Sequence, residues 1–268
     1  RLVAALVPTI AGSVFLDTVQ ALTDTLAAGG YQLMLGQSGY TGAREDALID
    51  AIVGRRPDGI VLTGLLGSPE GRRRLLAAGI PVVETWDLTP TPIDMLVGFS
   101  HEKVGREAAG FLHGKGYRRP AIVTADDHRA GLRRAGFEAR LQELGTARVP
   151  ACVVPAPSTL ANGRLGLRRL LQAHPRTDAV LCSSDVLAHG VVTEAQSRGM
   201  AVPGDLAVMG FGDQDFAGHT HPPLSTVHVD GAAIGAQAAR FIMNRVEGRD
   251  IGPRIRDIGF SIVERAST

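Results

Sequence analysis

The feature that most constrains the fold of this chain is a regular alternation of short apolar runs with longer segments of helical periodicity. Residues 2–7 are a continuous apolar run and residues 58–62 are hydrophobic on both faces, as expected for strands that are buried on both faces of a parallel sheet. In residues 15–28 the apolar residues recur at intervals of three and four, which is typical of an amphipathic helix. Repeated strand–helix units of this kind imply right-handed crossovers and a doubly wound parallel sheet of the α/β class.

The alternation runs in two series, which predicts two lobes. In the first series we expect strands at 2–7, 31–35, 58–62 and 81–83 and helices at 15–28, 44–53 and 69–78. In the second we expect helices at 101–113, 130–144, 159–173 and 185–197 and strands at 121–124, 152–154, 179–182 and 206–209. A helix over 234–246 and a strand over 255–263 belong to neither series. No linker rich in Pro or Ser separates the series near Phe99, so we expect lobes connected by short hinges.

The composition is that of a globular protein and excludes several function classes. Lys and Arg number 28 against 27 for Asp and Glu, and a net charge of +1 gives no general attraction to nucleic acid or membranes. No apolar run reaches the roughly 18 residues that a membrane span needs. Cys152 and Cys182 lie in apolar runs, so we expect buried, reduced thiols, which suits a cytoplasmic protein.

Catalytic and metal-binding motifs are sparse. Residues 36–39 lack the spacing of a nucleophile elbow, and the sequence has neither a phosphate-binding loop nor a dinucleotide fingerprint. Two candidate sites are His219 with His221 and the segment 126–128, where a hydrogen-bonded loop and a helix N-cap are the simpler interpretations. Arginine pairs such as 118–119 are scattered, as expected of solvated helix faces. The sequence therefore predicts a binding protein with no metal and no cofactor, and not an enzyme.

Local strings in a fixed order extend over nearly the whole chain. They are VPTI at 7–10 with SVF at 13–15, DGIVLT at 58–63, AGIPVV at 78–83, FSHE at 99–102, GYRRPAI at 116–122, RRAGF at 133–137, SDVLAHG at 184–190, PPLSTV at 222–227 and VERAST at 263–268. Their order and spacing resemble the effector-binding and dimerising core of the lactose/galactose-repressor family of bacterial transcription regulators. Within that family, Glu84, Trp86 and the segment 97–99 look most like gluconate-type repressors.

The resemblance implies a fold similar to that of periplasmic binding proteins, with two lobes and three chain crossovers between them. It assigns residues 1–99 and 230–257 to the N-terminal lobe, and residues 100–229 and 258–268 to the C-terminal lobe. Regulators of this family carry a helix-turn-helix ahead of the core, so we expect operator DNA to be bound only through that headpiece, which the sequence given does not contain. The alternative is a solute-binding receptor of a sugar transporter, which shares the fold.

The family's effector contacts come from loops that follow strands. Carried over by position, the expected ligand-binding residues are Ser13, Val14, Phe15, Thr63, Glu84, Trp86, Phe99, Arg133, Ser184 and Asp213. The flat indole of Trp86 suits the apolar face of a sugar ring. Simpler structural roles stay open for several of these residues: core packing for Phe15 and Trp86, hinge packing for Phe99, and an ion pair with an arginine for Glu84.

Arg133 is the candidate that says most about the effector. A planar guanidinium fork suits the vicinal oxygens of a sugar or a carboxylate. The family often has Asp where this chain has Gly212, and losing that acidic group lowers the repulsion toward a carboxylate. We therefore expect a sugar acid as effector, with a neutral sugar or polyol as the alternative if Glu84 and Asp213 restore the acidic character. The resemblance also implies a homodimer that uses helices at 44–53 and 185–197.

Overall fold

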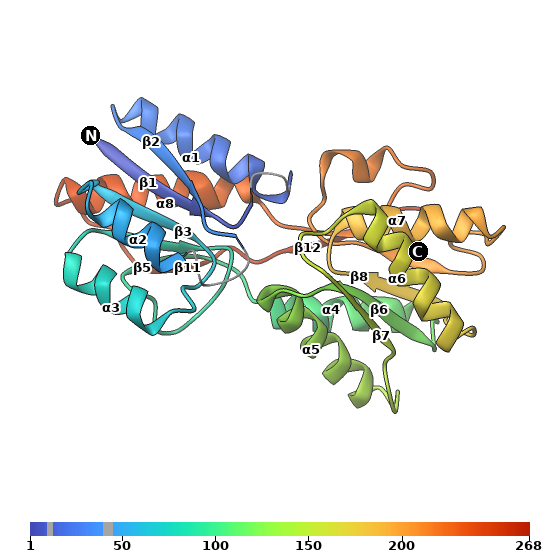
Figure 1. Ribbon diagram of the computed structural model, residues 1–268. Coiled ribbons are helices and arrows are strands. Elements are labelled where there is room, and N and C mark those ends of the chain that lie inside the picture. The colour runs from blue at the N-terminus through green and yellow to red at the C-terminus, as the bar shows by residue number, and fades with distance from the viewer. Residues whose placement is uncertain (10–12, 40–44) are drawn as a thin grey trace. The chain divides into compact units, whose positions relative to one another are not determined.

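The structure of the protein is a computed structural model that describes residues 1–9, 13–39 and 45–268 (Figure 1). The chain forms two compact units. Unit 1 comprises residues 1–100 and 230–259, and unit 2 comprises residues 101–229 and 260–268, so the chain passes between the units three times. These bounds lie one or two residues from those expected from the sequence. Ile10 of the VPTI string and Arg44 of the helix expected over 44–53 lie outside the described residues.

Unit 1 is built on a six-stranded parallel sheet with the order β11-β5-β4-β3-β1-β2. Its strands are β1 (Leu2–Val7), β2 (Gln32–Gln37), β3 (Gly59–Thr63), β4 (Val82–Thr85), β5 (Met95–Gly98) and β11 (Ile255–Asp257). Its helices are the short 3-10 helix η1 (Ser13–Phe15), α1 (Leu16–Ala28), α2 (Glu45–Val53), α3 (Pro69–Ala78) and α8 (Gly231–Val246).

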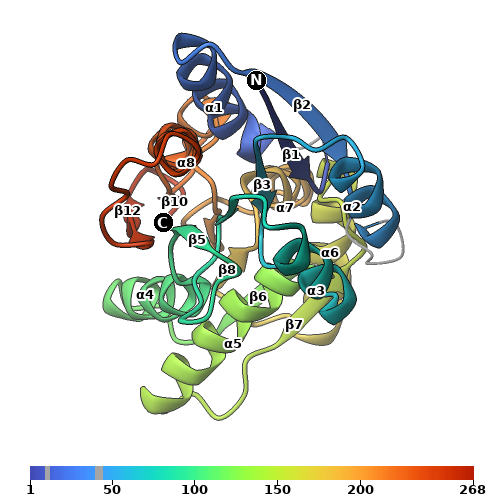
Figure 2. The same cartoon turned by 90° about the vertical axis from the view of Figure 1, so that its left-hand side faces the viewer.

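The helices of unit 1 cover both faces of this sheet (Figure 2). One face packs against α2 and α3 through an apolar cluster that includes Leu6, Ile49 and Leu75. The other face is covered by α1 and α8, which lie side by side (Figures 1 and 2). Their backbones approach so closely that a methyl group at Gly235 of α8 would overlap the carbonyl oxygen of Thr18 in α1. Only glycine fits that crossing, and it places Thr18 beside the start of α8.

Unit 2 contains a four-stranded parallel sheet with the order β7-β6-β8-β9 and a separate antiparallel pair, β10-β12. Its strands are β6 (Pro120–Ala125), β7 (Ala151–Val154), β8 (Ala179–Cys182), β9 (Ala207–Met209), β10 (Thr226–His228) and β12 (Ser261–Val263). Its helices are α4 (His101–Gly114), α5 (His128–Glu143), α6 (Leu160–Ala173), α7 (Asp185–Ser197) and the 3-10 helix η3 (Asp215–Gly218). The two parallel sheets with helices on their faces confirm the predicted fold class.

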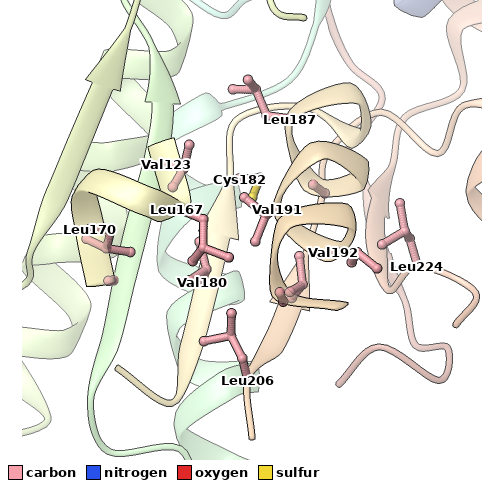
Figure 3. Close-up of a cluster of buried hydrophobic side chains, with 14 of the residues drawn as sticks. Val123, Leu167, Leu170, Val180, Cys182, Leu187, Val191, Val192, Leu206 and Leu224 are labelled. Carbon is pink, nitrogen blue, oxygen red and sulfur yellow. The ribbon is translucent and has the colours of Figure 1, made fainter. Parts of the chain in front are cut away.

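The core of unit 2 lies between the sheet and the pair α6 and α7 (Figure 3). Val123 and Val180 of the sheet face Leu167 of α6 and Val191 of α7 in this cluster. Cys182 belongs to the same core, and burial raises the pKa of its thiol. Both cysteines are free, but Cys152 is only partly buried, so the expectation of two buried thiols was wrong for Cys152.

Short strands account for the main differences from the predicted elements. The single strand expected over 255–263 is two strands, β11 in unit 1 and β12 in unit 2, separated by Gly259 at φ +67°. Strands β5 and β10 were not predicted, because a segment of three or four residues is too short for its periodicity to identify a strand. Among the described residues, no helix has the length and apolar character needed to cross a membrane.

Candidate functional site

Arg133 lies at the centre of a cluster of side chains in unit 2. It projects from the second turn of α5, and its side chain is buried. Its Nη1 lies 2.9 Å from Nδ1 of His101, and its Nη2 donates a hydrogen bond to the carbonyl oxygen of Ser183 at 3.0 Å. The guanidinium carbon lies 4.0 Å from the centroid of the Phe211 ring. Ser183 and Phe211 follow β8 and β9, so this cluster occupies the carboxyl edge of the sheet, where open α/β sheets bind ligands.

The contact between Arg133 and His101 fixes the tautomer of the histidine. A guanidinium carries only donors, so Nδ1 of His101 must accept the hydrogen bond and the ring proton must lie on Nε2. His101 is the first residue of α4 and is 2% exposed. Its ring also lies 6.1 Å from that of Phe211, centroid to centroid. His101 therefore holds one arm of the guanidinium in place as a neutral acceptor.

Ser183 connects this cluster to the strands beneath it. Its hydroxyl accepts a hydrogen bond from the backbone N–H of Ala125 at 2.9 Å, at the end of β6. The hollow beside Arg133, lined by Thr124, Leu181 and Ser183 among others, has a volume of about 10 Å³. That is room for about one water molecule. The hollow is therefore too small to hold a sugar.

Three predicted site residues come together in unit 1 as an aromatic cluster. The ring of Trp86 makes edge-to-face contacts with Phe15 at 5.2 Å and with Phe99 at 5.8 Å, measured between centroids. Its Nε1 donates to the Thr18 hydroxyl at 2.9 Å, and that hydroxyl donates to the carbonyl oxygen of Gly231 at 2.8 Å. Trp86 is 2% exposed and has φ +62°, a backbone region that bulky residues rarely adopt. A conformation of this kind persists only where surrounding contacts hold it.

Glu84 is buried within unit 1. It belongs to β4 and is 1% exposed, and its carboxylate accepts a hydrogen bond from the backbone N–H of Ile93 at 2.8 Å. Burial raises the pKa of Glu84, while backbone hydrogen bonds from Ile93 and Leu66 and the charge of Arg72 act in the opposite direction. The carboxylate thus holds the segment between β4 and β5 against the sheet.

Asp213 and Asp185 belong to a second polar network in unit 2. Asp213 follows β9 at φ +49°, and its carboxylate lies 2.7 Å from Nη2 of Arg265 and 3.0 Å from Nδ1 of His228. Asp185 accepts hydrogen bonds from the Thr226 hydroxyl at 2.6 Å and from the backbone N–H of Gln214 at 2.8 Å. Burial, the largest influence, raises the pKa of Asp185 to about 6. These contacts join the start of α7 to β10 and to the final segment of the chain.

The other expected site residues lie at element ends. Thr63 ends β3 and is partly buried, and Ser13 and Val14 lie in η1. Ser184 is the N-cap of α7, since its hydroxyl accepts from the N–H of Leu187 at 3.3 Å. In the segment 126–128 the capping interpretation is confirmed, because Asp127 accepts from the N–H of Ala130 at 2.9 Å.

Four residues of these clusters were not predicted from the sequence: Thr18, His101, Ser183 and Phe211. His101 lies within the recognised string at 99–102 and Ser183 directly precedes the one at 184–190, so their position after a crossover or a strand was an available signal. Nothing in the sequence marks Thr18, which meets Trp86 only because α1 and α8 cross closely. No three His, Cys, Asp or Glu side chains of the described residues gather where they could hold a metal ion.

Comparisons with known proteins identify relatives that share the sequence and the fold of this chain. A family model described as a periplasmic binding protein-like domain matches residues 109–268. The chain is 35% identical over 268 residues to the HTH-type transcriptional regulator GntR of Pseudomonas aeruginosa, covering 99% of this chain and 78% of the relative. The crystal structure of the transcription regulator GntR from Chromobacterium violaceum has a TM-score of 0.96 at 34% identity, covering 100% of this chain and 99% of that one.

A second solved structure gives the same answer. A LacI family transcriptional regulator from Silicibacter pomeroyi has a TM-score of 0.92 at 32% identity, covering 100% of this chain and 98% of that one. Whole-chain similarity at this level establishes the relationship for both units, not for one alone. The chain therefore belongs to the LacI family of transcriptional regulators and forms their periplasmic-binding-protein-like core.

Proposed function

We propose that this core binds a small sugar acid and that Arg133 recognises the carboxylate. The observation that carries the proposal is the position of Arg133, whose full positive charge is held at the carboxyl edge of the unit 2 sheet by His101 and Ser183. A guanidinium fixed in this way can pair with a carboxylate through two parallel hydrogen bonds. The rotational freedom of its side chain is already restricted, which lowers the entropic cost of binding.

The carboxylates of Glu84 and Asp213 support an acidic rather than a neutral effector. Glu84 is buried against the N–H of Ile93, and Asp213 is paired with Arg265. Both groups were considered as hydroxyl acceptors for a neutral sugar, and both are engaged within their own unit. Pairing with Arg265 also offsets the repulsion that Asp213 would exert on a bound anion.

The remaining contacts are assigned by position. We propose that the aromatic cluster of Phe15, Trp86 and Phe99 supplies the apolar side of the binding site. Trp86 is 2% exposed and Phe99 is fully buried, so the cluster would form a rigid apolar wall and not a ring face that stacks on the sugar. Hydroxyl groups at strand and helix ends supply hydrogen bonds, with backbone positions in η1 beside them. The hydroxyl groups are those of Thr63 and Ser184, and the backbone positions in η1 are Ser13 and Val14.

We further propose that the protein acts in the cytoplasm as a homodimeric, non-enzymatic repressor core. Effector binding changes the equilibrium between two arrangements of the dimer, and a helix-turn-helix outside residues 1–268 responds at the operator. The name of the Pseudomonas relative, an HTH-type regulator, supports that assignment. The apolar face of α7 is occupied by the unit 2 core, so that helix contributes less to a dimer than its sequence suggested.

Exposed apolar side chains on two edge strands support the dimer. Leu35 on β2 is 48% exposed, and Val153 on β7 is 44% exposed. An edge strand with such residues is a natural site for association. Sedimentation at tens of micromolar should give a dimer, and a monomer at that concentration would contradict this part of the proposal.

Isothermal titration calorimetry tests the effector class. The panel pairs each aldonic acid, gluconate among them, with its aldose and its alditol, which differ mainly at the carboxylate carbon. At least one acid should bind more tightly than both of its neutral counterparts. A neutral sugar that binds tightly, with no binding by any acid, would overturn the proposal.

A further inference from the structure

A second hollow in unit 2 is lined by basic side chains and lies outside the site described above. Its volume is about 280 Å³, close to the lower end of the roughly 300–1,000 Å³ range of small-molecule sites. Three chain segments form it, at 118–120, 146–150 and 173–177, which lead into β6, β7 and β8. Because the sheet order is β7-β6-β8, these segments are neighbours at the amino edge of the sheet.

Four arginines and one histidine line this basic hollow: Arg118, Arg119, Arg148, Arg176 and His174. No carboxylate belongs to its lining. The nearest counter-charge is Asp178, which accepts hydrogen bonds from the backbone N–H groups of Arg118 and Arg119 and lies 3.5 Å from Nε of Arg119. The arginines therefore outnumber the single carboxylate that pairs with them.

Two of the arginines have no partner within the described chain. Neither Arg148 nor Arg176 makes a hydrogen bond or an ion pair with a described residue, and both are exposed. Arg118 donates to the carbonyl oxygens of His113 and Tyr117, which fixes its side chain without neutralising its charge. Glu138, in the adjoining hollow that shares Arg148, is already paired with Arg134 at 2.6 Å. Positive charge is thus concentrated here, and among the described residues Asp178 is the one carboxylate that pairs with these arginines.

We infer that the basic hollow binds a small anion with two or more negative charges, carried by phosphoryl or carboxyl groups. Planar guanidinium forks match the oxygens of both groups, and arginines from three separate segments could surround one anion. The Arg133 cluster lies at the opposite, carboxyl edge of the same sheet, about 20 Å away along the six residues of β6. The basic hollow is therefore a second ligand site, independent of the proposed effector site.

Calorimetry with inorganic pyrophosphate and with citrate, at about 0.15 M ionic strength, tests this inference. We expect saturable binding of one anion per chain, and the tighter of the two probes identifies the phosphoryl or carboxyl class. In the double variant Arg148→Gln, Arg176→Gln the affinity should fall about tenfold or more, because two charge-assisted contacts are lost. Both residues are exposed and unpaired, so the thermal melting of the variant should match that of the parent chain.

A matched control removes the same charge elsewhere. The double variant Arg55→Gln, Arg240→Gln loses two exposed arginines of unit 1, and its pyrophosphate and citrate affinities should be unchanged. Arg133→Met should also leave the binding of both anions intact, which separates the basic hollow from the effector site. Absence of saturable binding by the parent chain, or an equal loss in the two double variants, would overturn the inference.

Discussion

The guanidinium of Arg133 donates a hydrogen bond to Nδ1 of His101 across 2.9 Å, and this contact joins α5 to the first residue of α4. The helices cross so closely at this point that a methyl group at Gly105 would overlap the carbonyl oxygen of Arg133. Backbone and side chain together therefore determine where the positive charge lies. The residue proposed to bind the effector is in this way positioned by one that was not predicted from the sequence.

Replacing His101 tests that positioning role. His101→Phe keeps a ring of similar size but removes the acceptor, so Arg133 loses one of the contacts that orient it. The affinity for the sugar acid should fall about tenfold, the value of one hydrogen bond to a charged group. His101→Gln, whose amide oxygen can accept the bond, should recover part of the loss in the same calorimetric titration. If the His101→Phe variant binds the sugar acid as tightly as the parent chain does, His101 does not position Arg133 for binding.

Glu194 should be among the most stabilising charged residues of unit 2. Its side chain is 4% exposed, and it contacts Arg164, Arg168 and Arg198 at 2.8–3.1 Å. Hydrogen bonds from these arginines, above all Arg168, lower the pKa of Glu194 to about 2. Glu194→Gln leaves three guanidinium groups without their shared anion and should lower the free energy of unfolding by about 1–3 kcal/mol at neutral pH.

Glu143 is the matched control for that experiment. It contacts Arg106 and Arg140, but it is exposed, so solvent screens the interaction. Denaturant titration at neutral pH should show a clear loss for Glu194→Gln and little change for Glu143→Gln. A loss for Glu194→Gln no larger than that for Glu143→Gln would show that the three ion pairs of the buried Glu194 add no more stability than exposed ion pairs.

Asp185 should make the stability fall as the pH rises from about 4 to above 6. Its pKa is about 6 in the folded chain against an ordinary 3.8, so the folded state holds a proton that the unfolded state has released. Ionising the buried carboxyl then costs up to about 3 kcal/mol at neutral pH. Asp185→Asn cannot ionise and should flatten this part of the stability profile, measured by denaturant titration from pH 4 to 8. The exposed Asp215→Asn is the control, and superimposable profiles for Asp185→Asn and the parent chain would contradict the prediction.

Gly235 should tolerate no side chain, because the backbone of α1 occupies the space of a methyl group. Gly235→Ala should lower the free energy of unfolding by about 1–3 kcal/mol through overpacking, partly offset by up to about 1 kcal/mol of helix propensity. In α4, Gly110 has no atom within 4 Å of the same methyl position, so Gly110→Ala should be neutral or slightly stabilising. Thermal melts of the two variants make the comparison, and a Gly235→Ala protein as stable as Gly110→Ala would rule out the close crossing.

The fold could be predicted from the sequence wherever periodicity was long enough to read. Buried strands such as β1 and β3 are continuous apolar runs, and α6 and α7 keep their apolar faces over three turns. Strands of three residues, such as β10 and β12, carry no such signal and are held by contacts between distant segments. One example is the antiparallel pairing of Thr226 in β10 with Val263 in β12.

The candidate site could be predicted only in part. Arg133 was predicted because it opens a recognised string, and Trp86 because it follows one, whereas their contacts with His101 and Thr18 depend on which helices cross. For Glu84, too, the sequence identified the residue but not its hydrogen-bond partner. Its charge suggested a ligand contact, but only the structure reveals that its carboxylate holds the N–H of Ile93. Hydrogen-bond partners depend on how distant segments pack together, and a single sequence does not reveal that packing.

The most direct test of the account compares one aldonic acid with its alditol on the parent chain and on Arg133→Met, a variant that keeps an unbranched side chain but lacks the guanidinium and its charge. Losing a buried charged partner costs about 2–5 kcal/mol, so the parent chain should prefer the acid by tens- to thousands-fold. In Arg133→Met this preference should collapse to about one, while the melting temperature and the binding of pyrophosphate persist. An Arg133→Met protein that still prefers the acid as strongly as the parent chain would contradict the assignment of Arg133 as the carboxylate-binding residue.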